Sequence, residues 1–147
     1  MPQGNPYETI LAFDVGARRI GVARAHLQAL FPQPLTTLDA PDRFVEDIVA
    51  LCQSERAGAI VIGLPRGMSG QDTAQTTAVR AFGERLQEQL QIPVYWTDEA
   101  LTSAKAEAEL QMRGRPYVRG DIDALAATYI LEDFITHQKT KVEQIHG

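Results

Sequence analysis

Two apolar segments of β-strand character, residues 10–16 and 20–25, lie on either side of a short turn near the start of the chain. Their spacing predicts a β-hairpin. The first segment reads ILAFDVG, so Asp14 interrupts an otherwise buried strand. A buried carboxylate costs free energy unless a cation, a metal or several hydrogen-bond donors compensate its charge. The fold must therefore supply a partner for Asp14.

Strand and helix patterns alternate along the rest of the chain. Hydrophobic periodicity predicts strands at 34–38, 59–64 and 93–97, and helices at 40–55, around 79–90, at 102–112 and at 121–137. The order β-β-β-α-β-α-β-α-α indicates an α/β fold, with a mixed five-stranded sheet and helices on both faces. The first, fourth and fifth strands would form its parallel part. We expect a single domain over residues 1–147, with flexible tails at 1–8 and 138–147.

Composition narrows the classes of protein to which the chain can belong. No apolar run approaches the roughly 20 residues of a membrane span, and the N-terminus lacks the pattern of a signal peptide. The single cysteine, Cys52, forms no internal disulfide and suits a reducing cytoplasm. A net charge of −5 argues against a protein that coats nucleic acid through overall positive charge. The arginines nevertheless cluster, at Arg18, Arg19 and Arg24 and again at Arg113, Arg115 and Arg119.

Four further acids lie at the ends of predicted elements. Asp98 and Glu99 come where the fifth strand ends, and Asp121 and Asp123 come at the start of the last helix. Each pair has a structural alternative, because acids in a first helical turn cap free amides and complement the helix dipole. At about 100° per residue, Asp121 falls on the polar side of its helix, whereas Asp123 falls within the apolar face. We therefore expect Asp121 to cap the helix and Asp123 to have a metal-binding or catalytic role.

Divalent-metal chemistry would account for these acids together. Mg²⁺ prefers carboxylate oxygens and retains several waters, so three or four acids from separate elements suffice to bind it. Two such ions about 4 Å apart can activate a water and stabilise the leaving oxygen in phosphodiester cleavage. The histidines, at 26, 137 and 146, make no ligand spacing with Cys52, so zinc is not expected.

Four motifs occur in order along the chain: DVGARRIGVA (14–23), GLPRGMSG (63–70), DEALTS (98–103) and DIDALAA (121–127). Over about residues 9–136 they resemble a bacterial family of Holliday-junction resolvases and precursor ribosomal RNA nucleases, which have a ribonuclease H-like fold. The resemblance implies that Asp14, Glu99 and Asp123 are catalytic and hold Mg²⁺ or Mn²⁺. The implied activity is hydrolysis of phosphodiester bonds, in ribosomal RNA precursors or in branched or single-stranded nucleic acid. Four points stay open: whether the substrate is RNA or DNA, whether cleavage is internal or terminal, which metal is used, and whether the protein is a monomer or a homodimer.

Other residues of these motifs have expected supporting or substrate-binding roles. Asp98 would orient Glu99 or a neighbouring backbone group, and Arg19 would either pair with an acid or approach a phosphate. Gly67 and Gly70 would either expose amides to phosphate or form a structural turn. The expected nucleic-acid contacts are Arg18, Arg113, Arg115, Arg119 and Tyr117, the last stacking on a base. A solvated loop is the alternative for the segment 113–119.

One motif departs from the family pattern. The family usually has an arginine where this chain has Ala100 and a glutamate where it has Lys105. The loss of the arginine beside Glu99 puts substrate positioning and the strength of catalysis in question. It leaves open a non-catalytic module that binds nucleic acid or protein on the same fold. The first motif also resembles the phosphate-binding hairpin of actin-like kinases, but 147 residues leave no room for the second domain that such a kinase requires.

Overall fold

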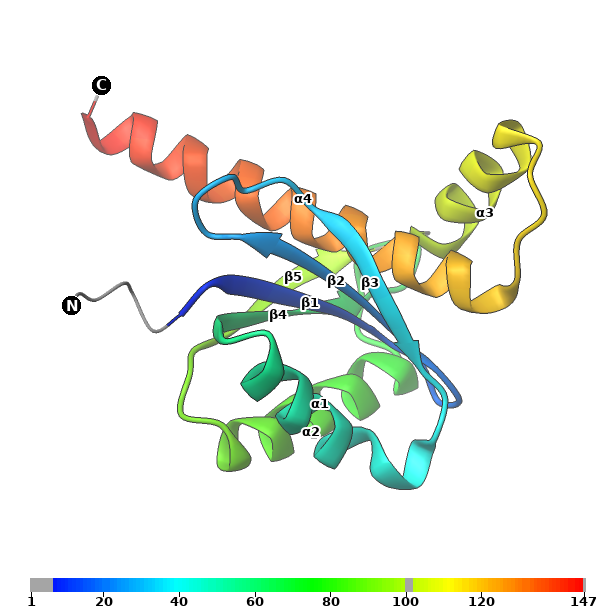
Figure 1. Cartoon of the computed structure of the whole chain (residues 1–147), viewed down its shortest axis with the longest axis horizontal. Coiled ribbons are helices and arrows are strands. Elements are labelled where there is room, and N and C mark those ends of the chain that lie inside the picture. The colour runs from blue at the N-terminus through cyan, green and yellow to red at the C-terminus, as the bar shows by residue number, and fades with distance from the viewer. Residues whose placement is uncertain (1–6, 100–101, 147) are drawn as a thin grey trace.

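The computed structural model describes residues 7–99 and 102–146, and within them the side chains of all residues except 99, 102–103 and 138–146. A single five-stranded sheet forms its centre, in the order β3-β2-β1-β4-β5 (Figure 1). The strands are β1 (Thr9–Val15), β2 (Ile20–His26), β3 (Gln33–Leu38), β4 (Ala57–Pro65) and β5 (Val94–Glu99). β1, β2 and β3 form an antiparallel meander, whereas β4 pairs parallel with both β1 and β5. The predicted mixed sheet and its parallel part are confirmed.

Helices cover both faces of this sheet, as predicted (Figure 1). They are the 3₁₀ turn η1 (Pro41–Arg43), α1 (Phe44–Ser54), α2 (Ala74–Gln89), α3 (Thr102–Arg113) and α4 (Arg119–His146). α1 and α2 pack on one face, and α4 crosses the other with α3 against its side. No helix in the part of the chain that the structure describes has the length and hydropathy of a membrane span.

The two faces of the sheet are packed differently. Leu11 and Phe13 of β1 point into a core of large aliphatic and aromatic side chains beneath α1 and α2. Ala12, between them, belongs to a second core under α4 that is rich in alanine. At Gly21 of β2 the helix comes so close that a Cβ atom would lie 1.9 Å from the backbone oxygen of Asp123. A glycine is therefore required there, and it brings the second turn of α4 directly onto the sheet.

The ends of two elements differ from the sequence expectations. α4 continues to His146 instead of ending at His137, because the segment QKTKVEQIH contains good helix formers and neither glycine nor proline. At the other terminus, the sequence predicts a flexible tail that includes Glu8. Its backbone N–H instead donates to Arg56 O at 2.7 Å, and its carbonyl accepts from the Leu27 N–H at 2.9 Å. These bonds continue the backbone pairing of the central strand by one residue before β1.

Candidate metal centre

Asp14 lies near the carboxyl end of β1, opposite Gly21 in the antiparallel pair of β1 with β2. It has the same strand parity as Ala12, so it belongs to the α4 face of the sheet. Burial raises the pKa of the Asp14 carboxyl from its ordinary 3.8 to about 6, and the negative charge of Asp123 adds to the shift. No hydrogen bond or ion pair compensates Asp14 among the described residues. The described residues thus leave this half-buried carboxylate without a partner for its charge.

Asp123 lies in the second turn of α4 and is directed at the sheet. Arg19, at the end of the β1–β2 turn, donates from Nε to Asp123 Oδ2 at 2.6 Å, and the Asp123 side chain is only 16% exposed. Of the two alternatives for Arg19, the structure thus has the pairing with an acid. Asp121 does something else: its Oδ2 accepts a hydrogen bond from the Val118 N–H at 2.9 Å, at the helix N-terminus. Asp121 thus caps the helix on its exposed side and Asp123 lies on the side toward the sheet, as the helical periodicity predicts, whereas a metal-binding role for Asp123 stays a prediction.

The third predicted ligand, Glu99, is the last residue of β5, where its backbone is in register with Pro65 of β4. Its side chain lies outside the described residues, as do Ala100 and Leu101. Asp98 is described, and its Oδ1 accepts from Arg66 Nε at 3.1 Å. Among the described side chains, which exclude that of Glu99, no three His, Cys, Asp or Glu residues gather closely enough to hold an ion.

The two carboxylates that are described nevertheless fit a hard divalent cation. Asp14 and Asp123 come from a rigid central strand and from the helix packed on it, and both offer only oxygen ligands. Two neighbouring carboxylates repel each other, and only Asp123 has an arginine partner. A cation between them would compensate the charge that Asp14 carries when it is ionised. The donor set and the uncompensated charge thus favour a hard divalent cation over a soft metal.

The loop between β4 and α2 forms a closed turn rather than an open phosphate cradle. The Gly67 N–H donates to Gln71 O at 2.8 Å, and the Gly70 N–H donates to Gly67 O at 2.9 Å. Gly70 has a φ of +81°, which favours glycine. With both amides engaged within the loop, the structural-turn interpretation of Gly67 and Gly70 is the better supported one.

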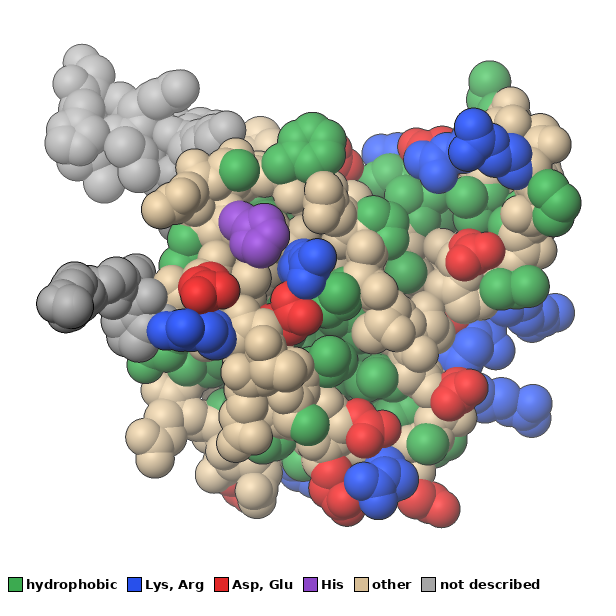
Figure 2. Space-filling model, viewed as in Figure 1, with side chains coloured by type: hydrophobic (Ala, Val, Ile, Leu, Met, Phe, Trp, Pro, Cys, Tyr) green, Lys and Arg blue, Asp and Glu red, His purple; other side chains and the backbone are tan. Residues whose placement is uncertain are grey.

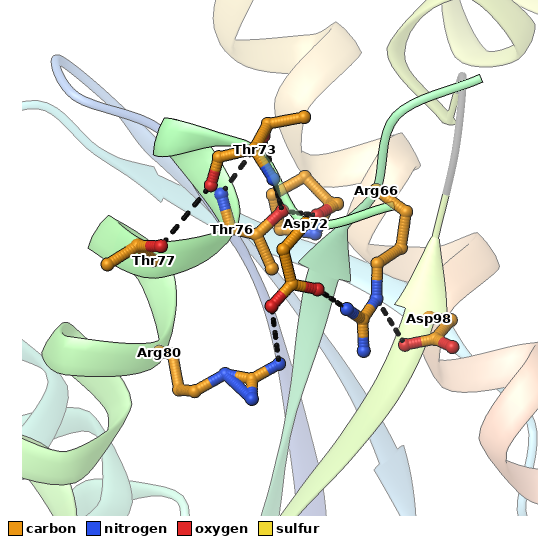
Figure 3. Close-up of polar contacts among 8 residues, drawn as sticks. Arg66, Asp72, Thr73, Thr76, Thr77, Arg80 and Asp98 are labelled. Carbon is orange, nitrogen blue, oxygen red and sulfur yellow. Dashed lines mark hydrogen bonds and ion pairs between the residues drawn. The ribbon is translucent and has the colours of Figure 1, made fainter. Parts of the chain in front are cut away.

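Sequence reasoning missed the side chain that organises this region, Arg66. Its guanidinium lies between two carboxylates, those of Asp72 at the end of the loop and Asp98 on β5 (Figure 3). Arg80 of α2 makes a looser contact with Asp72, at 3.9 Å. No spacing rule connects Arg66 with an acid 32 positions away, so only the parallel pairing of β4 with β5 reveals the contact.

The predicted nucleic-acid contacts lie around the β1–β2 turn and the loop between α3 and α4. Lys and Arg side chains gather on the side of the molecule that carries these loops, at the right in Figure 2. Arg18, Arg115 and Arg119 are exposed and have no carboxylate partner among the described residues, whereas Arg113 pairs with Glu109 at 2.5 Å. The half-buried Tyr117 lines a hollow of about 270 Å³, together with Arg113 and Arg115. Lys105 lies on α3 with its Nζ 4.4 Å from the centre of the Tyr129 ring.

Known proteins share both the sequence and the fold. The sequence profile of the RuvX family, described as Holliday junction resolvase, matches residues 8–137. A protein of Chloroflexus aurantiacus named "Putative pre-16S rRNA nuclease" is 38% identical over 143 residues, which cover 95% of this chain and 94% of that protein. A Synechococcus elongatus protein of the same name is 37% identical over 139 residues, covering 91% and 93%.

Among solved structures, RuvC of T. thermophilus in complex with a Holliday junction superimposes with a TM-score of 0.59, at 16% identity. The match covers 91% of this chain and 98% of RuvC, and it confirms the predicted ribonuclease H-like fold. Sequence identity to the curated relatives over nearly the whole length, together with the profile match, shows that the chain belongs to the RuvX family.

Proposed function

We propose that this RuvX-family protein is a cytoplasmic, divalent-metal-dependent nuclease that hydrolyses phosphodiester bonds in precursors of small-subunit ribosomal RNA. Family membership supports the nuclease class, and the names of the curated relatives support the substrate. The observation that carries the proposal is the half-buried Asp14 beside Asp123, which no described residue compensates. A protein that merely bound nucleic acid would have no need of a carboxylate in that place, because carboxylates repel phosphate.

The cation would be held by Asp14, Asp123 and Glu99. Position 99 has the same strand parity as Tyr95, whose ring packs against Phe134 of α4, so β5 offers this position to the α4 face. When bound, Mg²⁺ or Mn²⁺ lowers the pKa of water and neutralises charge on the leaving oxygen. Asp14 supplies a fixed ligand because it lies on the central strand β1, where it pairs with Gly21 of β2.

Arg19 has a positioning role in this proposal. Its Nε–H holds Asp123 Oδ2 and leaves Oδ1 without a protein donor among the described residues. One arginine thus orients the carboxylate and offsets part of the negative charge that two acids and a phosphate bring together. Asp98 orients the end of β5 through its bond to Arg66 and does not ligate the cation.

The substrate strand would follow the unpaired arginines. Arg18, Arg115 and Arg119 are free to contact phosphates, and their local positive charge offsets a net charge of −5 that would otherwise repel RNA. Tyr117, with one side of its ring on the α3–α4 core and a hollow beside it, offers a surface on which an unpaired base stacks. This arrangement favours a single-stranded nucleic acid.

The test is a cleavage assay with the wild type and the Asp14→Asn variant on end-labelled pre-16S RNA, single-stranded DNA, duplexes and a four-way junction. Each substrate is incubated with Mg²⁺, Mn²⁺ or EDTA. Metal-dependent cleavage of the RNA, absent in the variant, is the expected result. Symmetric nicking of the junction alone would replace the proposal with a dimeric resolvase. Binding without cleavage of any substrate would replace it with a non-catalytic module.

A further inference from the structure

The described part of the sheet leaves the carboxyl end of β5 supported from one side only. β5 is an edge strand, and its last pairs with β4 join Leu64 to Asp98 and Pro65 to Glu99. A ligand at the end of an edge strand is held less firmly than Asp14, which lies on a strand with neighbours on both sides. If Glu99 is to bind a cation together with the other two acids, an interaction other than the β4–β5 backbone pairing must fix the position of residue 99.

We propose that Arg66 is a positioning residue that fixes the end of β5, and with it Glu99, by joining Asp98 to the N-terminal region of α2. The proposal rests on the function proposed above. It adds a residue whose side chain does not reach the cation but determines how well the cation is bound.

The first support is the geometry of Arg66 itself. Its side chain is 23% exposed and lies between Asp72 and Asp98, with Nε 3.1 Å from Asp98 Oδ1 and Nη1 on Asp72 (Figure 3). A guanidinium that donates in two directions from a fixed plane joins two segments more rigidly than a single contact does. Since Asp98 directly precedes Glu99 in the chain, fixing one constrains the backbone of the other.

The second support is that the other end of the link is anchored. Thr73 caps α2 and exchanges hydrogen bonds with Thr76, which is fully buried. The Thr76 hydroxyl also donates to the carbonyl of Pro65, the register partner of Glu99. The closed turn at Gly67 and Gly70 places Asp72 beside Arg66. Helix, turn and strand end therefore form one rigid support, of which Arg66 is the only described side chain that reaches β5 by an ion pair.

The experiment measures Mn²⁺ binding to the full chain by calorimetry, for the wild type, Arg66→Gln, Asp98→Asn and the double variant. The matched control is Arg80→Gln, which removes a contact to the same Asp72 without touching β5. We expect Arg66→Gln and Asp98→Asn each to weaken Mn²⁺ binding about tenfold, as loss of an outer-shell partner does. The double variant should be no weaker than either single variant, because both remove one link. Arg80→Gln should bind as the wild type does.

Two further measurements separate positioning from direct substrate contact. Amide exchange at residues 97–99 should accelerate in Arg66→Gln, and kcat on single-stranded RNA should fall while KM stays within about twofold. If Arg66 instead bound phosphate, Asp98→Asn would release it and lower KM, which would overturn the proposal. If Arg66→Gln fails to fold, the same measurements are made on Arg66→Lys, which keeps the positive charge but lacks the planar guanidinium that donates in two directions.

Failure of the inference can be told apart from failure of the proposed function. A wild type that binds no Mn²⁺ would overturn the metal-dependent nuclease itself. A wild type that binds Mn²⁺, with affinity lost in Glu99→Gln but unchanged in Arg66→Gln, would overturn only the role of Arg66. Unchanged affinity in Glu99→Gln would also overturn it, because Arg66 would then have no ligand to position.

Discussion

Two arginines at opposite ends of β2 hold carboxylates in nearly the same way. Arg19, just before the strand, bonds Asp123 at 2.6 Å, and Arg24, within it, bonds Glu55 at 2.6 Å. The side chains are 33% and 16% exposed in the first pair and 31% and 19% in the second. One pair faces α4 and the other the C-terminal end of α1. Neither distance nor burial distinguishes them.

The difference is a third charged group. Asp14 lies beside the first pair, and its pKa is raised to about 6 partly by the charge of Asp123. The contacts of Glu55 with the described residues include no second carboxylate: its backbone carbonyl accepts from the Thr9 hydroxyl at 2.9 Å, and its carboxylate pairs with Arg24. An ion pair alone is an ordinary structural element, whereas an ion pair with one carboxylate in excess leaves a charge for a cation to compensate. The contrast predicts which variants lose activity and which lose only stability.

The largest effect is expected from Asp14→Asn. The variant keeps the shape of the side chain but removes the charge that would hold the cation, so cleavage should fall at least about a hundredfold. Metal-dependent cleavage of labelled RNA measures this loss, and thermal unfolding shows that the fold is retained. The control is Asp39→Asn, which changes an exposed carboxylate beyond β3. Full activity in Asp14→Asn would show that the extra carboxylate beside the Arg19–Asp123 pair does not make that end of β2 a functional site.

Asp123→Asn and Asp121→Asn test the same contrast along one helix. Asp123→Asn removes a proposed ligand and leaves Arg19 without its carboxylate, so cleavage and Mn²⁺ affinity should both fall by more than about tenfold. Asp121→Asn weakens only the bond to the Val118 N–H and should cost about 0.5–1 kcal/mol of stability with activity within about threefold. Cleavage rates and Mn²⁺ titrations of the two variants compare them directly. Equal damage from both would mean that the side of the helix does not decide the role.

The sequence predicts much of this contrast because its signals are local. The period of 3.6 residues separates Asp121 from Asp123, and a carboxylate within an apolar strand marks Asp14. Arg66 could not be found in the same way, because its link to Asp98 depends on which strands are neighbours and in what register. The glycines at 67 and 70 were ambiguous for a related reason. A glycine permits both an exposed amide and a closed turn, and only the hydrogen bonds to Gln71 and within the turn decide between them.

The pH dependence of stability is a smaller effect with a definite sign. In the cation-free protein the Asp14 carboxyl has a pKa of about 6, against 3.8 when unperturbed. Between these values the folded state binds more protons than the unfolded state, so the free energy of unfolding should fall as pH rises from about 4 to about 6. The contribution is about 2–3 kcal/mol. Urea unfolding in EDTA at several pH values measures it as the difference between the wild type and Asp14→Asn.

In that comparison Asp14→Asn should be the more stable protein at pH 7 in EDTA, since it no longer buries a charge without a partner. Saturating Mn²⁺ should stabilise the wild type, by an amount set by its concentration relative to Kd, but should have little effect on the variant. A wild type and a variant with the same pH profile would show that Asp14 is compensated within the protein.

The smallest effect on cleavage is expected at the other end of β2. Glu55→Gln leaves Arg24 without its carboxylate, and the Arg24 Nε already has no hydrogen-bond partner among the described residues. Because the pair is partly exposed, the free energy of unfolding should fall by only about 1–2 kcal/mol. Urea unfolding measures this change, while Mn²⁺ affinity and cleavage should stay at wild-type values. Replacing both partners by methionine should recover much of the lost stability, since no charge is then left buried. The contradicting outcome is a loss of Mn²⁺ affinity in Glu55→Gln as large as the loss in Asp123→Asn. Both ion pairs would then contribute to cation binding. The excess carboxylate at Asp14 would no longer explain why only one end of β2 is a functional site.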